Sequence, residues 1–448
     1  MTQQRNFTTG SVSKTLVRFT VPIVLTLLLQ TLYSAVDLLI VGQFSTVSDV
    51  SGVTIGSQAL TLLTGLCTGL AMGSTVLIGR KIGENDQDGA ASVIQNSVVL
   101  FGGVALASML VLLFGNNLLV SLLKTPTDAV AQTSRYLFVC TLGIPMIFAY
   151  NVLGSVFRGL GDSKTPLIAV TIACISNIFL DLLLVAGFNL GATGAAIATV
   201  IAQGISVVAS VLIVKSNYFK FEKGKTNFHC IAQIFNIGLP IAIQSVLTTF
   251  SFVVLTVIVN QYNSVSFSAA VGVSEKLCGF IMLIPLAFGH SIAAYVAQNM
   301  GAGQLDRAKK SLYIGIAYSL SYGIIMAFLA FFYGDTLARV FTSDAAVLLS
   351  AKDYLRSYAF DTALVPIFFC MSGFFNGCGK TTFVMLQGVL SAIFMRIPLA
   401  YLFSLLYPAS LFHIGLGTPI TTFIQIFICL YYYKRIMRKS QLLCVSAT

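Results

Sequence analysis

Charged side chains are scarce in this 448-residue chain, since Asp, Glu, Lys and Arg together make up 9% of it. Ordinary soluble domains carry about 25% charged residues. The mean hydropathy is +0.89, and 56% of the residues are hydrophobic. A surface facing water cannot be built from this composition. We therefore expect most of the chain to face lipid or other apolar helices.

Residues that usually carry enzyme chemistry are also few. The three histidines, His229, His290 and His413, lie far apart, and the cysteines lack the spacing of metal ligands. Most cysteines sit inside apolar segments, where they act as small hydrophobes. A membrane-bound transferase would need a histidine or paired acids at a membrane face and a sizeable extramembrane loop. We predict that the protein is not an enzyme and has no cofactor, and that no signal peptide is removed.

Long apolar segments are abundant, and each is long enough for a helix across a hydrocarbon core, which needs about 20 residues. The sequence therefore predicts an all-α polytopic membrane protein with twelve transmembrane helices. The predicted segments are 16–41, 52–77, 92–114, 132–157, 165–186, 191–214, 233–259, 267–296, 311–332, 350–376, 382–407 and 416–433.

Basic residues are distributed unevenly between the loops. With a cytoplasmic N-terminus, nineteen of the 26 Lys and Arg residues fall inside and five outside, while Lys276 and Arg396 lie within segments. Cytoplasmic loops carry such an excess in membrane proteins. The net charge of +11 thus indicates topology and not nucleic-acid binding. We predict a monomer in the bilayer of the cell inner (plasma) membrane, with both termini cytoplasmic.

An internal repeat runs through the chain at an offset of 218 residues. Pro22 matches Pro240, and GRKIGENDQDGA (79–90) matches AQNMGAGQLDRA (297–308); Tyr136-Leu137 matches Tyr354-Leu355. FRGLGDSKT (157–165) resembles FNGCGKTT (375–382), and GAAIAT (194–199) resembles GTPITT (417–422). Six helices per unit place both units in the same orientation, related by a pseudo-twofold along the membrane normal. We predict lobes at 1–214 and 233–448, joined by a cytoplasmic linker at 215–232.

Ionisable residues inside the apolar segments are the main functional candidates, because burying them in a membrane is costly. Asp37 lies in the first segment. Asn177 and Asp181 lie four residues apart on the fifth, so they share a helix face, and Thr199 is in the sixth. Together they would make an oxygen-rich cluster for sodium, or for a proton shared by two carboxylates that repel each other when both are ionised. A structural hydrogen-bond network between helices is the alternative.

These motifs resemble those of the multidrug and toxic compound extrusion (MATE) transporter family across roughly residues 15–435. The resemblance implies export of amphipathic, often cationic compounds by antiport with sodium or protons. It also implies a coupling site made of an aspartate on the first helix, an Asn-x-x-x-Asp pair on the fifth and a threonine on the sixth. Here these match Asp37, Asn177 with Asp181, and Thr199, and Pro22 matches a helix-bending proline.

The second half departs from the pattern of other branches of this family, which carry a glutamate eight residues after the seventh helix's proline. Thr248 stands there instead, and Asp37 aligns with Leu255, so we expect no equivalent coupling cluster in the second half. Arg396 pairs with Glu275 or another acid, or contacts substrate, and these alternatives stay open. The substrate-cavity candidates are Gln30, Tyr33, Gln244, Glu275 and Arg396.

The predicted function is thus a sodium- or proton-coupled antiporter that works by rocker-switch alternating access between the lobes. A flippase for lipid-linked saccharides is the alternative, and it would need a strongly basic cavity that Lys276 and Arg396 alone do not provide. A channel, which would conduct without a second ion's gradient, is a third possibility.

Overall fold

The computed structural model describes residues 7–123, 125–217, 226–262, 264–408 and 410–445, with the backbone alone at 214–217 and 439–445. Residues 218–225 of the predicted linker lie outside the described residues. The first half of the chain contains α1 (Val12–Phe44), α2 (Val47–Gly83), α3 (Gln87–Leu122), η1 (Thr127–Ala129), α4 (Val130–Leu142), α5 (Ile144–Gly159), α6 (Lys164–Asp181), η2 (Leu182–Gly187) and α7 (Gly191–Asn217).

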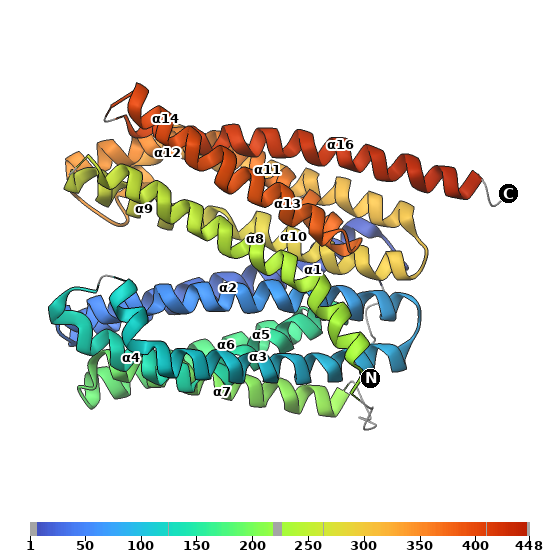
Figure 1. Cartoon of the computed structure of the whole chain (residues 1–448), viewed down its shortest axis with the longest axis horizontal. Coiled ribbons are helices and arrows are strands. Elements are labelled where there is room, and N and C mark those ends of the chain that lie inside the picture. The colour runs from blue at the N-terminus through green and yellow to red at the C-terminus, as the bar shows by residue number, and fades with distance from the viewer. Residues whose placement is uncertain (1–6, 124, 218–225, 263, 409, 446–448) are drawn as a thin grey trace. The chain divides into compact units, whose positions relative to one another are not determined.

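The second half is helical in the same way. It contains α8 (Phe228–Asn260), α9 (Val265–Ile281), α10 (Leu283–Gly301), α11 (Leu305–Ala338), α12 (Ala345–Gly377), α13 (Thr381–Ser391), η3 (Ala392–Arg396), α14 (Ile397–Leu406), α15 (Leu411–Gly415) and α16 (Gly417–Val445). Figure 1 shows these elements coloured along the chain.

The predicted fold class, an all-α polytopic membrane protein, is confirmed. Among the described residues, ten helices are long and apolar enough to cross a membrane, and the number rises to twelve when each of two bent pairs is one span. The bent pairs are η1–α4 with α5, which turn by 56°, and α9 with α10, which turn by 41°. The sequence predicted each pair as one continuous segment, because a bend at a single residue leaves the apolar run intact.

The helix boundaries repeat at the offset found in the sequence. The first residues of α2 and α9, Val47 and Val265, are 218 apart, and so are the last residues of α2 and α10, Gly83 and Gly301. The last residues of α5 and α12, Gly159 and Gly377, have the same separation. Each half therefore has one straight helix where the other half has a bent pair.

The contacts divide the chain into two units. Unit 1 comprises Met1–Ala242 and Ala297–Leu305, and unit 2 comprises Ile243–Val296 and Asp306–Thr448. One helix is most deeply buried in each unit. In both α2 and α12, 67% of the 18-residue apolar stretch that could cross a membrane is buried. Gly69 and Gly73 of α2 let the backbone of α8 approach closely, since an added Cβ would meet Ala242 at the first and Ile234 at the second.

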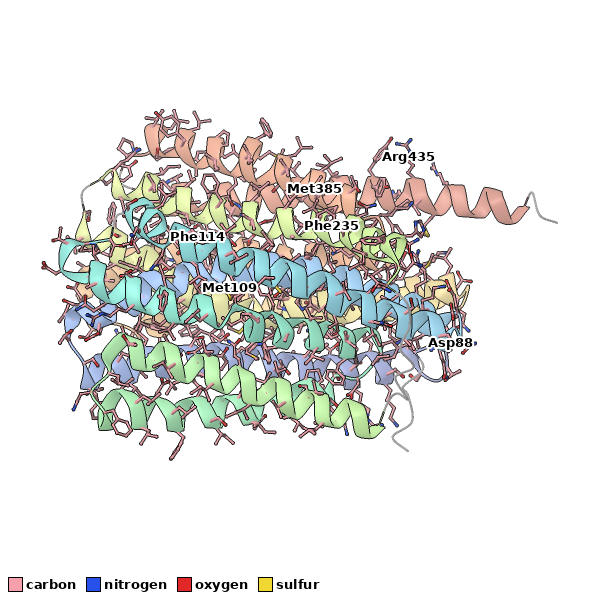
Figure 2. All side chains as sticks on the ribbon, turned by 60° about the horizontal axis from the view of Figure 1, so that its bottom comes forward. Asp88, Met109, Phe114, Phe235, Met385 and Arg435 are labelled. Atoms are coloured by element: carbon pink, nitrogen blue, oxygen red, sulfur yellow. The ribbon has the colours of Figure 1, made fainter. Side chains whose placement is uncertain are left out.

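Other helices expose their apolar side chains, as expected next to lipid. In α3 only 11% of the 18-residue apolar stretch that could cross a membrane is buried, and Phe114 is 89% exposed. Figure 2 shows Asp88 at one end of α3, with Met109 and Phe114 farther along the helix. The charge is thus confined to the helix end, and the apolar face covers the length that crosses the membrane.

The start of α3 is held by a capping residue outside the spans. The Asp86 carboxylate accepts a hydrogen bond from the Gly89 amide at 2.8 Å, and Lys81 Nζ lies 2.9 Å from its other oxygen. The hydrogen bond from Lys81 is the main cause that lowers the pKa of Asp86, and the Gly89 amide adds to it. Both interactions stabilise the turn between α2 and α3.

Candidate functional site

The four predicted coupling residues meet inside unit 1. Asp37 lies on α1, Asn177 and Asp181 lie on α6, and Thr199 lies on α7. Helix α6 packs against both α1 and α7, which brings the four side chains to one place. The two aspartates and Asn177 are buried, with exposed fractions of 8%, 0% and 2%. Thr199 is half-buried.

The Asp37 carboxyl is the centre of the cluster. Thr199 Oγ1 donates a hydrogen bond to Asp37 Oδ2 at 3.3 Å. The side chains of Asp181 and Asn177 also adjoin the Asp37 carboxyl. The helices therefore gather two carboxyl groups, an amide and a hydroxyl, as the sequence predicted.

Most polar atoms of this cluster have no hydrogen-bond partner. These buried atoms are Asp37 Oδ1, both carboxylate oxygens of Asp181, and the amide oxygen and nitrogen of Asn177. Two ionised carboxylates only accept hydrogen bonds, so neither can satisfy the other unless one carries a proton or a cation lies between them. Within the described part of the chain, no Lys or Arg is among the groups that act on either carboxyl.

A local irregularity positions Asp181. It is the last residue of α6, and the chain continues directly into the π-helical segment η2, where the Phe188 amide bonds to the Leu183 carbonyl at 3.0 Å. Segments of π-helix inside α-helices are frequent at functional sites. No residue pattern in the sequence indicated this segment.

The cavity candidates on α1 have partners on α5 and α7. Gln30 Nε2 donates to the Tyr150 hydroxyl at 2.6 Å. Tyr33 is half-buried, and Tyr150, Asp37 and the side chain of Gln203 are among its neighbours. Sequence reasoning missed Tyr150 and Gln203. Helical spacing places residues of one helix relative to each other but not relative to a helix that is distant in sequence.

Unit 2 contains the other cavity candidates, and the structure does not bring them together as one cluster. Glu275 on α9 accepts a hydrogen bond from Thr256 Oγ1 at 3.2 Å. Gln244 on α8 faces Gly388 of α13, where an added Cβ would meet its side chain.

Arg396, at the end of η3, has its own set of neighbours. It is 7% exposed, donates from Nη1 to Ser251 Oγ at 2.9 Å, and lies 4.5 Å from the Phe252 ring centre. Neither of these contacts is with an acid, so the alternatives for Arg396 stay open.

The expectation that the second half lacks an equivalent cluster stays a prediction. Asp37 does align with the apolar Leu255, but α12 supplies a different carboxyl, Asp361, which is 2% exposed. Thr422 on α16 donates a short hydrogen bond from Oγ1 to Asp361 Oδ1.

Pro22 lies inside α1, which runs without a break from Val12 to Phe44. Its carbonyl accepts a hydrogen bond from Thr26 Oγ1 at 2.8 Å. The proline cannot donate to the preceding turn, so α1 lacks one backbone hydrogen bond fifteen residues before Asp37. Its bending role stays a prediction.

A chain with this many apolar helices belongs to the polytopic membrane proteins. The sequence model of the MatE family matches residues 22–183 and again residues 240–402. The chain therefore belongs to the MatE family. The two matches begin at Pro22 and Pro240, which are the first pair of the internal repeat.

The relatives of the chain are bacterial multidrug transporters. It is 27% identical over 401 residues to the probable multidrug resistance protein YpnP of Bacillus subtilis (strain 168), covering 89% of this chain and 90% of that protein. It is 25% identical over 395 residues to the multidrug export protein MepA of Staphylococcus aureus (strain MRSA252), covering 86% of each.

The fold is similar to that of solved transporters. An outward-facing structure of a multidrug resistance MATE family transporter of the MOP superfamily superposes with a TM-score of 0.92 at 19% identity, covering 98% of this chain and 99% of that one. Together with the family match, these likenesses make the chain a transporter of the MATE multidrug efflux family and not an enzyme.

Proposed function

We propose that the protein is a cation-coupled antiporter that exports amphipathic, often cationic compounds across the cell inner membrane. The coupling ion, sodium or a proton, binds the cluster of Asp37, Asn177, Asp181 and Thr199. The relatives named for multidrug resistance and multidrug export support the substrate class. The distribution of basic residues supports cytoplasmic termini.

The observation that carries the proposal is the pair of adjacent buried carboxyl groups, of whose four oxygens only one accepts a hydrogen bond among the described residues. Asp37 has one hydrogen bond, from Thr199, and Asp181 has none. A bare pair of negative charges in an apolar interior is strongly unfavourable. A bound proton or a hard cation removes this cost, and carboxylate, amide and hydroxyl oxygens suit such a cation.

Coupling requires that the ion changes a conformational equilibrium. An ion does so only if it binds two conformations with different affinity. Since the cluster draws on α1, α6 and α7, any relative movement of these helices changes how many oxygens surround the ion. We propose that ion entry from outside favours release of the exported compound and that ion release inside restores the state that accepts it.

The flippase alternative is less well supported. It requires several basic groups in a cavity for a diphosphate. Among the residues that the structure describes, Arg396 is the basic side chain that is buried, and it already contacts Ser251 and Phe252. One guanidinium with its own partners is a poor site for two phosphates.

Proteoliposomes loaded with a fluorescent cation test the proposal. We expect an inward gradient of either sodium or protons, each imposed separately, to drive release of the fluorescent compound, and Asp37→Asn and Asp181→Asn to abolish that release in folded protein. Transport that is equally fast without any ion gradient would contradict the proposal and would favour a channel.

A further inference from the structure

The first described residues of the chain fold back onto the end of a helix from the second half. The side chain of Phe7 is buried, and its ring centre lies 4.8 Å from that of Phe19 on α1. The Phe7 amide donates a hydrogen bond to Gln298 Oε1 at 3.2 Å, and its carbonyl accepts one from Asn299 Nδ2 at 3.4 Å. Helix α10 therefore binds both polar backbone groups of Phe7. Residues 7–11, which precede α1, are called the N-terminal strap below.

The two amide side chains are suited to hold a main chain. Gln298 and Asn299 are buried, and an amide group can donate and accept hydrogen bonds at once. The matching residues of the first repeat are Arg80 and Lys81, whose side chains only donate. The second repeat thus has, where the strap docks, the two side chains that can bind an N–H and a carbonyl together.

Gln298 also connects α10 to other helices of unit 1. Its Nε2 donates to the carbonyl of Gly159, the last residue of α5, at 3.0 Å. Its own carbonyl lies against Gly83 at the end of α2, so closely that an added Cβ there would collide with it. The strap, α2 and α5 therefore hold the end of α10 from three sides, and all of these residues belong to unit 1.

Helix α10 is divided between the two units. Residues 283–296 belong to unit 2, whereas Ala297–Gly301 belong to unit 1. A relative movement of the units must therefore bend α10 at this point or free its end. Sharp bends occur at proline, at Gly and Ser pairs or at π-helical turns, and residues 292–300 contain none of these. Release of the end is thus favoured over a bend.

We propose that the N-terminal strap is a conformational latch, which holds the end of α10 in unit 1 and releases it when the units move during transport. Phe7 anchors the latch, and Gln298 and Asn299 bind its main chain. Because Phe7 contacts Phe19, the latch also ties α10 to α1, the helix that contains Asp37. The inference rests on the alternating access of the proposed function but not on which ion is coupled.

Distances between spin labels on the two units test the latch. The labels are introduced as unnatural amino acids at two exposed positions, Asp88 of α3 and Lys310 of α11, so the native cysteines stay unmodified. Phe7→Ala removes the buried ring, and Asn299→Ala removes one hydrogen bond. We expect the ratio of the distance populations to change by about tenfold or more in Phe7→Ala and by about fivefold in Asn299→Ala.

A third variant and a control complete the set. Gly10 has a φ of +74°, and an added Cβ there meets nothing within 4 Å. Gly10→Ala therefore disfavours the turn of the strap without a clash, and its populations should shift in the same direction as those of Phe7→Ala. Phe114→Ala makes the same chemical change at a side chain that is 89% exposed, and it should leave the populations unchanged.

Hydrogen exchange of the same variants separates a latch from a merely structural contact. We expect faster exchange at the end of α10 together with the population shift, and unchanged exchange in α3. Unchanged populations in Phe7→Ala, Asn299→Ala and Gly10→Ala would overturn the latch, even if exchange at the end of α10 became faster. If Phe7→Ala does not fold, the other two variants decide. Since no ion gradient is applied, failure of Asp37→Asn to alter transport would refute the proposed ion coupling and leave the latch result readable.

Discussion

At the scale of single residues, the coupling cluster depends on a few donors around two acids. Among the described residues, Thr199 donates a hydrogen bond to Asp37 at 3.3 Å, which is long for an O–H donor. Asp37 Oδ1 and both oxygens of Asp181 have no hydrogen-bond partner among the described residues. The cluster is therefore rich in acceptors and poor in donors, which suits a positively charged ligand.

The role of Thr199 can be tested by two substitutions of different chemistry. Thr199→Val keeps the shape of the side chain and removes the hydroxyl, whereas Thr199→Ser keeps the hydroxyl. A hydrogen bond to a charged group contributes about 1.5–3 kcal/mol, and this long bond belongs at the lower end. We expect Thr199→Val to raise the ion concentration for half-maximal transport by about tenfold and Thr199→Ser to change it little. Equal behaviour of the two variants would mean that the hydroxyl plays no part.

The sequence predicted this cluster because its members carry a local signal. A charge in an apolar run stands out, and the spacing of Asn177 and Asp181 fixes their common helix face. The partners of these residues carry no such signal. Tyr150, Gln203 and Thr422 are ordinary residues of apolar helices, and their roles appear only when helices far apart in sequence pack together.

At the scale of helices, α1 and α8 form a natural comparison. Each contains a proline at the same repeat position, Pro22 and Pro240, but fifteen residues later α1 has Asp37 and α8 has Leu255. Each of the two helices therefore lacks one backbone hydrogen bond at its proline, but only α1 carries the carboxylate at this repeat position. The two prolines separate a general structural effect from one linked to the ion site.

We expect Pro22→Ala to slow ion-driven transport several-fold, because it restores the backbone hydrogen bond and stiffens the helix that carries Asp37. Pro240→Ala restores the same bond on a helix without the acid, and we expect a smaller loss. Initial rates in proteoliposomes, corrected for the amount of folded protein, measure both. A larger loss in Pro240→Ala would contradict the link between the bend in α1 and the ion site.

Gly83 and Gly301, which match in the internal repeat, explain why the stretches 79–90 and 297–308 are similar. An added Cβ at Gly83 would meet the Gln298 carbonyl, and one at Gly301 would meet the Arg80 carbonyl, so the ends of α2 and α10 approach each other backbone to backbone. Both contacts lie within unit 1. The similarity of GRKIGE and AQNMGA thus has a packing reason, namely that each stretch makes room for the other.

Gly83→Ala and Gly301→Ala should each destabilise the protein by about 1–3 kcal/mol, as overpacking does in tightly packed interiors. The control is Gly102→Ala on α3, where an added Cβ meets nothing within 4 Å and a gain in helix propensity is expected. Thermal unfolding followed by tryptophan-independent fluorescence of a thiol-reactive dye compares the three. A melting temperature for Gly83→Ala equal to that of Gly102→Ala would contradict the close approach.

The turn between α2 and α3 predicts a small pH effect. The pKa of Asp86 is lowered in the folded protein, so its contribution to stability is present above the pKa of the unfolded chain, near 4, and is lost as the pH falls through the folded value. Because the ion pair with Lys81 is largely exposed, the loss should be below about 1 kcal/mol. Melting temperatures of wild type and Asp86→Asn should differ at pH 6 and converge toward pH 3. A difference that grows as the pH falls would contradict this assignment.

Whole helices were easier to predict from the sequence than their internal irregularities. Every predicted segment overlaps a helix or a bent pair, because a membrane core imposes a minimum apolar length. The π-helical segments η2 and η3 and the bend between α9 and α10 were not predicted. Each shifts the backbone by a residue or less, without a change of composition.

At the scale of the whole molecule, the distribution of basic residues makes a testable statement about orientation. A fluorescent protein fused after Thr448 should fluoresce, and alkaline phosphatase fused there should be inactive, because both termini are predicted to be cytoplasmic. Alkaline phosphatase inserted between Ser45 and Thr46, in the connection from α1 to α2, should be active. The reverse result at either position would contradict the predicted topology.

The molecule as a whole is a repeat whose halves have diverged in charge. Their helix boundaries still match at 218 residues. Unit 1 has two buried acids in its cluster, and unit 2 has one buried acid, Asp361, which accepts a hydrogen bond from Thr422. We expect this asymmetry to confine the exchangeable ion to one unit.

The most direct test of the central claim is counterflow in proteoliposomes. An imposed gradient of an exported fluorescent cation should drive sodium or protons in the opposite direction, recorded with a radioactive sodium tracer or a pH-sensitive dye. We predict ion movement in the wild-type protein and none in folded Asp37→Asn. Ion movement that persists in Asp37→Asn would contradict the account.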